Sequence, residues 1–217
     1  MLTGRTPLDM EDALSEIIVP DLRCAADFLE DKNPKEKKDL FEEHKQKAWQ
    51  KQIEARCDFK RKVRITRRSD LFFITIWQKS VMGRTLTEIK SDESMIDKFA
   101  DEMAALIIDI IGGQEMRKGQ WCIITTPKRR HTVRNFATSI SMKIAEILNI
   151  RFYEDVCSCH TKQRMNAIFS VNVVPEEQNI ICFDDFVTTG QTLAAMKRAL
   201  LPYNKNMMFF AGINNQL

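Results

Sequence analysis

The sequence predicts an α/β fold: an open parallel sheet with helices on both faces, preceded by a helical region and a β-hairpin. Three observations lead to this prediction. Apolar strand-like runs and amphipathic helix-like runs alternate from residue 121 to residue 213, which is typical of βαβ units. The first 56 residues instead repeat their apolar positions at helical spacing. After these residues, over the first strand of the expected hairpin, the apolar pattern changes to a period of two residues.

The composition is that of an ordinary globular protein. Of 217 residues, 44% are hydrophobic and 29% are charged, and only 7 are glycine and 6 are proline. No apolar run approaches the roughly 18 residues that a membrane span needs, and the early residues Asp9, Glu11 and Asp12 do not fit a signal peptide. We therefore expect a cytoplasmic protein without membrane contact, whose 6 cysteines are thiols.

Three parts are expected along the chain. They are a helical N-terminal region over 1–57, a β-hairpin with its connection over 58–90, and an α/β domain over 91–217. The longest N-terminal helix is expected to begin at Asn33-Pro34, because proline is favoured at the first helical position. Ser69-Asp70 would turn the first hairpin strand into the second, over 71–78.

Positive charge is concentrated in and before the hairpin. Residues 32–68 hold 14 Lys and Arg against 6 Asp and Glu, whereas the whole chain has a net charge of +3. The first hairpin strand should have one basic and one mostly apolar face. The basic face is Lys60, Lys62, Arg64, Thr66 and Arg68, and the apolar face is Phe59, Val63 and Ile65. A solvated surface is the usual role of such a stretch, and contact of 60–68 with nucleic acid is a second possibility.

The α/β domain contains the elements that predict the parallel sheet. Gly112-Gly113 should end its first helix, and apolar runs such as 180–183 suit strands that are covered on both faces. The expected elements, in order, are a helix over 94–111, a strand over 121–126, a helix over 134–148, strands over 151–156, 169–174 and 180–183, a helix over 192–201, and a strand over 207–213.

The stretch 179–192 carries the most informative pattern. An apolar strand ends in Asp184 and Asp185, and a loop of small residues then opens the next helix. This loop consists of Thr188, Thr189, Gly190, Gln191 and Thr192. Ligands of open α/β sheets bind at the carboxyl ends of strands, and the start of a helix offers N–H groups and the positive end of its dipole to a phosphate.

The two carboxylates need a different explanation, because they would repel a phosphate. They suit a ligand that also carries hydroxyl groups, whose protons Asp184 and Asp185 can accept, or a metal ion. Each residue alone also fits a structural role, with the acids at a strand end and Thr-Thr-Gly as a turn and helix cap. Their combined order favours a site for a sugar phosphate.

This stretch resembles the hallmark of the type I phosphoribosyltransferases, an apolar strand followed by Asp-Asp-x-x-Thr-Thr-Gly-x-Thr. Residues 184–192 match it at every defined position. Within that superfamily the chain is most similar to the ComF (competence protein F) group, through two further segments with changed spacing. These are Arg134-Asn135-Phe136-Ala137 and Gln163-Arg164-Met165-Asn166-Ala167-Ile168-Phe169.

The resemblance implies an enzyme that binds 5-phosphoribosyl 1-pyrophosphate with Mg²⁺. A nitrogen nucleophile would displace Mg-pyrophosphate from ribose C1. Asp184 and Asp185 would accept from the ribose 2- and 3-hydroxyls, directly or through Mg²⁺, and residues 188–192 would hold the 5-phosphate. The loop Thr126-Pro127-Lys128-Arg129 would bind pyrophosphate, with Arg130 and His131 beside it. The hood over 157–166 would bring Lys162 and Arg164 to the pyrophosphate, and Arg164 joins the two acids as an implied catalytic residue.

Departures from the family pattern limit what the resemblance implies. Thr188 stands where members that salvage 6-oxopurines carry an acidic residue, which disfavours that substrate class. ComF-like proteins often begin with a Cys-x-x-Cys zinc pair, whereas the N-terminal part here has only Cys24 and Cys57. Cys157-Ser158-Cys159-His160 lacks the usual spread of a zinc site.

The acceptor is therefore not identified, and its recognition would fall to the N-terminal region. A catalytically silent regulator of the same fold, or a nucleic-acid-associated protein, is the alternative function. A homodimer is a further expectation that the residues leave open.

Overall fold

The computed structural model describes residues 55–127, 135–159 and 168–215. The chain divides into two compact units, residues 1–52 and 53–217, and every described residue lies in the second. The helical region expected over 1–57 therefore lies almost entirely outside the described residues. Its last two residues form the short strand β1 (Arg56–Cys57), which pairs with β4 (Arg84–Thr85).

Six strands form the main sheet, in the order β2-β3-β10-β9-β5-β6. All neighbouring pairs are parallel except β2 and β3, which form the antiparallel hairpin. The predicted parallel-dominated α/β fold is thus confirmed. The strands are β2 (Arg64–Arg68), β3 (Leu71–Gln78), β5 (Trp121–Thr125), β6 (Arg151–Tyr153), β9 (Asn179–Val187) and β10 (Asn206–Asn214).

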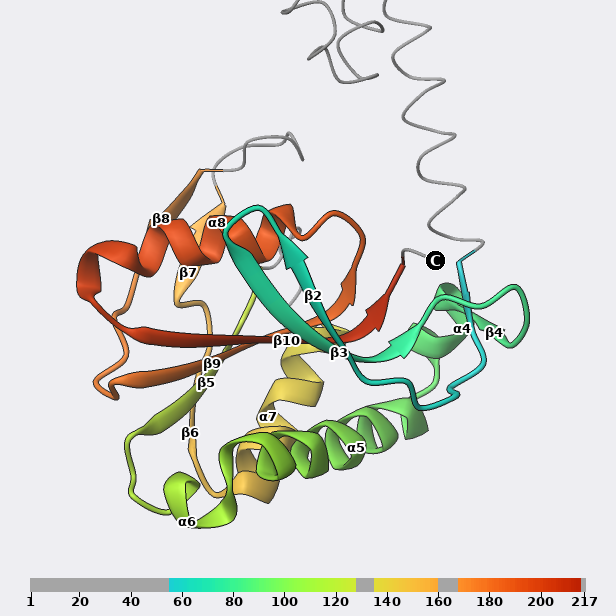
Figure 1. Ribbon diagram of the computed structural model, residues 1–217, viewed down its shortest axis with the longest axis horizontal. Helices are drawn as coiled ribbons and strands as arrows, with labels where there is room; N and C mark the ends of the chain where they lie inside the picture. Colours follow the sequence, from blue (N-terminus) through green and yellow to red (C-terminus); the bar gives the residue numbers. More distant parts are fainter. Residues whose placement is uncertain (1–54, 128–134, 160–167, 216–217) are drawn as a thin grey trace, which may run out of the picture. The chain divides into compact units, whose positions relative to one another are not determined.

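Helices cover both faces of this sheet, with α5 and α7 below it and α8 above it in Figure 1. A buried cluster that includes Phe99, Ile144 and Phe183 packs against α5 and α7, and a second that includes Cys182 and Leu193 packs against α8. We call these sides the α5–α7 face and the α8 face. The helices are α4 (Leu86–Ser91), α5 (Ser94–Ile111), α6 (Gly113–Met116), α7 (Phe136–Leu148), α8 (Gln191–Leu200) and the 3₁₀ turn Leu201–Tyr203. None of the described helices combines the length and apolar character needed to cross a bilayer.

The hairpin is part of the main sheet. β3 pairs with β10 from Ile74 to Gln78, and residues 58–90 lie in the same compact unit as 91–217. The expected apolar face of the first hairpin strand is not buried, since Val63 is 43% exposed and Ile65 is 72% exposed. β2 is the edge strand of the main sheet, which leaves these two side chains exposed.

Most predicted elements form close to their expected bounds, but three strands differ. The strand predicted over 151–156 is the shorter β6, which ends at Tyr153. The strand predicted over 180–183 extends to Val187 as β9, because its pairing with β10 continues past the apolar run. The strand predicted over 169–174 is the shorter β8 (Phe169–Val171), which pairs with β7 (Cys157–Cys159) in a separate antiparallel ladder. Neither β7 nor β8 belongs to the main sheet.

Among the described cysteines, Cys159 is expected to react first with an alkylating reagent. Burial raises the pKa of Cys57 and of Cys157 to about 11, raises that of Cys122 to about 12 and raises that of Cys182, whereas Cys159 is exposed. The thiolate is the reactive form, so the four buried thiols should react only on opening. Peptide mass spectrometry after brief iodoacetamide treatment at pH 8 measures this order. Labelling of the buried cysteines at the rate of Cys159 would contradict it.

Candidate functional site

The carboxyl end of β9 forms the centre of the candidate site. β9 pairs with β5 only as far as Phe183, opposite Thr125, whereas its pairing with β10 continues to Val187. Asp184 and Asp185 therefore lie within an extended strand that projects past β5. Successive side chains of a strand point to opposite faces, so the two predicted acids do not point to the same side of the sheet.

Asp184 points to the α8 face. Its Oδ1 accepts a hydrogen bond from the buried Thr126 hydroxyl at 3.3 Å, just beyond the end of β5. The charge of Asp184 also contributes, after burial, to raising the pKa of the Cys182 thiol, whose side chain belongs to the cluster under α8. The carboxylate and the start of α8 thus share one side of the sheet.

Asp185 points to the opposite side and forms an ion pair with Lys90. The Lys90 Nζ lies 2.6 Å from Asp185 Oδ2, and Asp185 is only 9% exposed. Lys90 lies on α4, whose apolar residues Leu86 and Ile89 belong to the cluster of the α5–α7 face. The sequence motif predicts that both acids bind one ligand. In the structure, Asp185 instead has a cationic partner of its own, Lys90.

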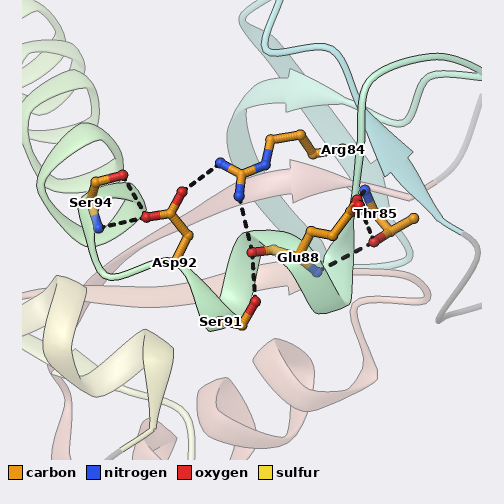
Figure 2. Close-up of polar contacts among 6 residues, drawn as sticks. All are labelled: Arg84, Thr85, Glu88, Ser91, Asp92 and Ser94. Carbon is orange, nitrogen blue, oxygen red and sulfur yellow. Dashed lines mark hydrogen bonds and ion pairs between the residues drawn. The ribbon is translucent and has the colours of Figure 1, made fainter.

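Short polar contacts fix the position of α4, as Figure 2 shows. Thr85 caps the helix, with its Oγ1 accepting from the Glu88 backbone N–H, and the Glu88 carboxylate accepts from the Thr85 backbone N–H at 2.6 Å. At the other end, Arg84 pairs with Asp92 at 2.7 Å, and Asp92 accepts from the Ser94 N–H at the start of α5. Hydrogen bonds from Ser94 and then Arg84 lower the pKa of Asp92. Lys90 is therefore carried by a helix that is held at both ends.

The loop Thr188–Gly190 joins β9 to α8. Gly190 has a φ of +76°, in the left-handed region that favours glycine, and its carbonyl accepts the first hydrogen bond of the helix, from the Ala194 N–H at 2.9 Å. The Thr188 carbonyl accepts from the Arg68 guanidinium, and the Thr188 hydroxyl accepts from Asn215 Nδ2 at 3.3 Å. The start of α8 is thus an ordered turn with the positive end of a helix dipole directed at it.

The structure brings some of the predicted site residues together. Asp184, Thr126 and the loop 188–192 meet on the α8 face; Thr189 and Gln191 are exposed, and Thr188 and Thr192 are half-buried. Pro127 is half-buried after β5, but Lys128, Arg129, Arg130 and His131 lie outside the described residues. The predicted hood residues Lys162 and Arg164 also lie outside the described residues.

Two basic residues at this site were not found by sequence analysis. Nothing in the local sequence links Lys90 to Asp185. Arg68 was assigned to a basic strand face, although its guanidinium reaches a carbonyl 120 residues further along the chain. Both contacts join segments that are distant in sequence, so only the tertiary structure reveals them.

The described side chains would bind Mg²⁺ only together with oxygen atoms of a bound ligand. The described residues hold no group of three or more His, Cys, Asp or Glu side chains that could bind a metal ion. Mg²⁺ is commonly held by one or two carboxylates together with substrate phosphates and waters, and Asp184 can supply one such carboxylate. At the Cys157–Cys159 segment, Cys157 is buried and Cys159 is exposed, and His160 lies outside the described residues.

No protein-family model and no curated protein sequence matches the chain. Among solved structures, an adenine phosphoribosyltransferase matches 70% of this chain and 84% of its own, with 14% identity and a TM-score of 0.44. Orotate phosphoribosyltransferase from Aeropyrum pernix matches 74% of this chain and 75% of its own, with 16% identity and a TM-score of 0.39. A hypoxanthine-guanine phosphoribosyltransferase from Bacillus anthracis matches 58% and 80%, with 12% identity and a TM-score of 0.42.

All three are phosphoribosyltransferases. Each TM-score is below 0.5 and each identity is below 25%, so the function is inferred below from the residues of this chain. The similarity to the ComF group stays a prediction from sequence.

Proposed function

We propose that this chain is a phosphoribosyltransferase that binds 5-phosphoribosyl 1-pyrophosphate with Mg²⁺, transfers the phosphoribosyl group to a nitrogen acceptor and releases pyrophosphate. The observation that supports it most strongly is that Asp184 and the start of α8 lie on the same face of the sheet. A carboxylate that accepts from hydroxyls beside a turn that suits a phosphate matches a phosphorylated sugar.

Each part of this ligand has a residue to hold it in the proposal. The N–H groups and hydroxyls of Thr188, Thr189, Gly190, Gln191 and Thr192 hold the 5-phosphate, and Asp184 accepts from the ribose hydroxyls. Asp185 supports that edge of β9 through Lys90. The loop Thr126-Pro127-Lys128-Arg129 and the hood residues Lys162 and Arg164 bind the pyrophosphate, whose negative charge grows as its bond to C1 breaks.

Mg²⁺ would be held by Asp184 together with the ligand's own oxygens, and it would supply charge neutralisation at the leaving pyrophosphate. The residues of this chain would orient the sugar and exclude water from C1. No covalent intermediate with a side chain is required, because the acceptor nitrogen attacks C1 directly. The nature of that acceptor, and a homodimer, stay outside the proposal.

Two measurements, made one after the other, test this function. At a ligand concentration of about 100 times its dissociation constant, 5-phosphoribosyl 1-pyrophosphate with Mg²⁺ should raise the free energy of unfolding by about 2.7 kcal/mol. A thermal shift assay with ribose as the control ligand measures this. Pyrophosphate release is then followed across a panel of nitrogen acceptors. A chain that is not stabilised by the ligand would refute the proposed site.

A second candidate function has one observation in its favour. Several basic residues between 60 and 68 are exposed on and before the edge strand β2, namely Lys60, Arg61, Lys62, Arg64 and Arg67. A silent member of the fold that binds nucleic acid through 60–68 would show stabilisation by the sugar pyrophosphate without pyrophosphate release. Its DNA affinity would fall with salt, with a log–log slope of about −0.9 for each phosphate contact.

A further inference from the structure

The tip of the β2–β3 hairpin packs against α8 and the loop before it. Lys197 of α8 pairs with Asp70 in the hairpin turn at 2.9 Å. A β-carbon built on Gly190 would lie 3.5 Å from both Leu71 and Phe73, at the start of β3. The hairpin therefore lies against the Gly190 side of the loop that is proposed to hold the 5-phosphate, and it leaves Thr189 and Gln191 exposed.

Arg68, the last residue of β2, reaches that loop directly. Its Nη1 donates to the Thr188 carbonyl, and its Nη2 lies 3.4 Å from Asn214 Oδ1. The guanidinium carbon lies 5.4 Å from the centre of the Phe73 ring, and Cδ would lie 3.6 Å from a β-carbon on Gly190. Two hydrogen bonds, an aromatic ring and the loop backbone together fix this side chain.

The charge of Arg68 has no anionic partner among the described residues. The oxygens that accept from it belong to a carbonyl and to an amide, which are neutral, and no described carboxylate forms an ion pair with it. Arg68 is half-buried, and this loss of solvent lowers its pKa. A desolvated cation without a counter-charge is costly to maintain, and the cost is recovered when an anion binds beside it.

We propose that Arg68 is a positioning residue for the phosphate-binding loop: it fixes the Thr188 carbonyl and supplies positive charge to the bound 5-phosphate. This inference rests on the proposed function. In this proposal the hairpin brings a cation to the phosphate end of the site. The start of α8 has no basic residue in its first turn, where Gln191, Thr192 and Leu193 stand.

The neighbouring Arg67 provides a matched control. It has the same chemistry on the same strand, but it points to the other face, where its guanidinium lies 5.4 Å from the exposed Phe72 ring and donates to the Ser69 carbonyl. Removing the charge of Arg67 therefore changes the net charge of the protein equally and leaves the loop intact.

The experiment measures the affinity of the full chain for ribose 5-phosphate and for inorganic pyrophosphate, by calorimetry at two salt concentrations. Arg68→Met should weaken ribose 5-phosphate about 10- to 100-fold, as expected for loss of a hydrogen-bonded charge, and change pyrophosphate binding less than about 3-fold. Arg67→Met should leave both affinities within about 2-fold of the unchanged chain. Arg68→Lys keeps the charge but not the two-pronged guanidinium that contacts both Thr188 and Asn214. Its ribose 5-phosphate affinity should lie between those of Arg68→Met and Arg67→Met.

Two results would overturn the inference while the proposed function stands. One is equal ribose 5-phosphate affinity in Arg68→Met and Arg67→Met. The other is an equal loss for both ligands in Arg68→Met, which indicates general damage to the fold. If Arg68→Met does not fold, Arg68→Lys serves as the test. Ribose 5-phosphate affinity equal to that of the unchanged chain would show that the guanidinium contacts of Arg68 do not position the loop. An unchanged chain that binds neither ligand would refute the proposed function itself.

Discussion

Replacing Asp184 with asparagine is expected to lower kcat/KM for pyrophosphate release by about 100- to 10,000-fold. Hydrogen bonds to a charged group contribute about 1.5 to 3 kcal/mol each, and two ribose hydroxyls are proposed to donate to this carboxylate. The asparagine keeps the shape of the side chain and an oxygen that can accept from Thr126. Its free energy of unfolding should therefore change by less than about 0.5 kcal/mol. Steady-state kinetics with the best acceptor and urea denaturation measure the two effects.

Asp185, the second predicted site acid, provides the comparison that tests which of the two carboxylates binds the ligand. Asp185→Asn leaves the Lys90 ammonium beside a buried amide, which should cost about 1 to 2 kcal/mol of stability, between the values typical of exposed and buried ion pairs. Lys90→Met in the same chain should recover part of that loss. Equal kinetic losses in Asp184→Asn and Asp185→Asn, without a change in stability, would contradict the separation of the two acids.

Gly212→Ala is expected to lower the free energy of unfolding by about 2 kcal/mol, a typical cost of overpacking a core. A β-carbon at Gly212 would lie 2.6 Å from Phe99 Cε1 and 2.8 Å from the Asp185 carbonyl oxygen. Phe99 cannot move easily, because it is buried and its ring lies 4.6 Å from that of Trp77 and 5.3 Å from that of Phe136. β9 would shift instead, so ligand binding should weaken together with stability. Urea denaturation and calorimetry measure both.

Gly113→Ala is the control for this substitution. Gly113 is the first residue of α6, and a β-carbon there would meet only the flexible end of Arg117, at 3.8 Å. Its stability should change by less than about 0.5 kcal/mol. Phe99→Leu in the Gly212→Ala chain should remove the clash, so the double variant should be more stable than the sum of the two single changes predicts. Strict additivity would show that the crowding at Gly212 lies elsewhere.

The parts of the fold that depend on local pattern were predictable from sequence. The helix expected over 94–111 forms as α5 with those bounds, because its apolar stripe faces the core and Gly112 ends it. The motif after β9 was also predictable, since a strand, two acids, small residues and a helix follow one another directly. The hydrogen bonding between strands could not be predicted from the local sequence pattern. β9 continues to Val187 because β10 pairs with it there, although the apolar pattern ends at Phe183.

That longer strand changes the interpretation of the site. With the strand ending at Phe183, Asp184 and Asp185 would lie in a loop that could turn both toward one ligand. Within an extended strand they alternate, and each meets a partner from a distant segment: Thr126 for Asp184 and Lys90 for Asp185. The sequence could place both acids at the carboxyl end of the sheet. It could not show that Arg68 and Lys90 approach that end from opposite faces.

The central position of β10 has a consequence for how the molecule assembles. β10 lies between β3 and β9, so within the main sheet the hairpin strands β2 and β3 are joined to β9, β5 and β6 through residues 206–214. During synthesis, the hairpin and the β9–β5–β6 half must wait for the last described strand to emerge before the sheet can close. Pairings so distant in sequence slow folding and leave strand edges open to aggregation. Chains interrupted before residue 206 should therefore require chaperones or be degraded, although all of the proposed ligand-binding residues have already been made.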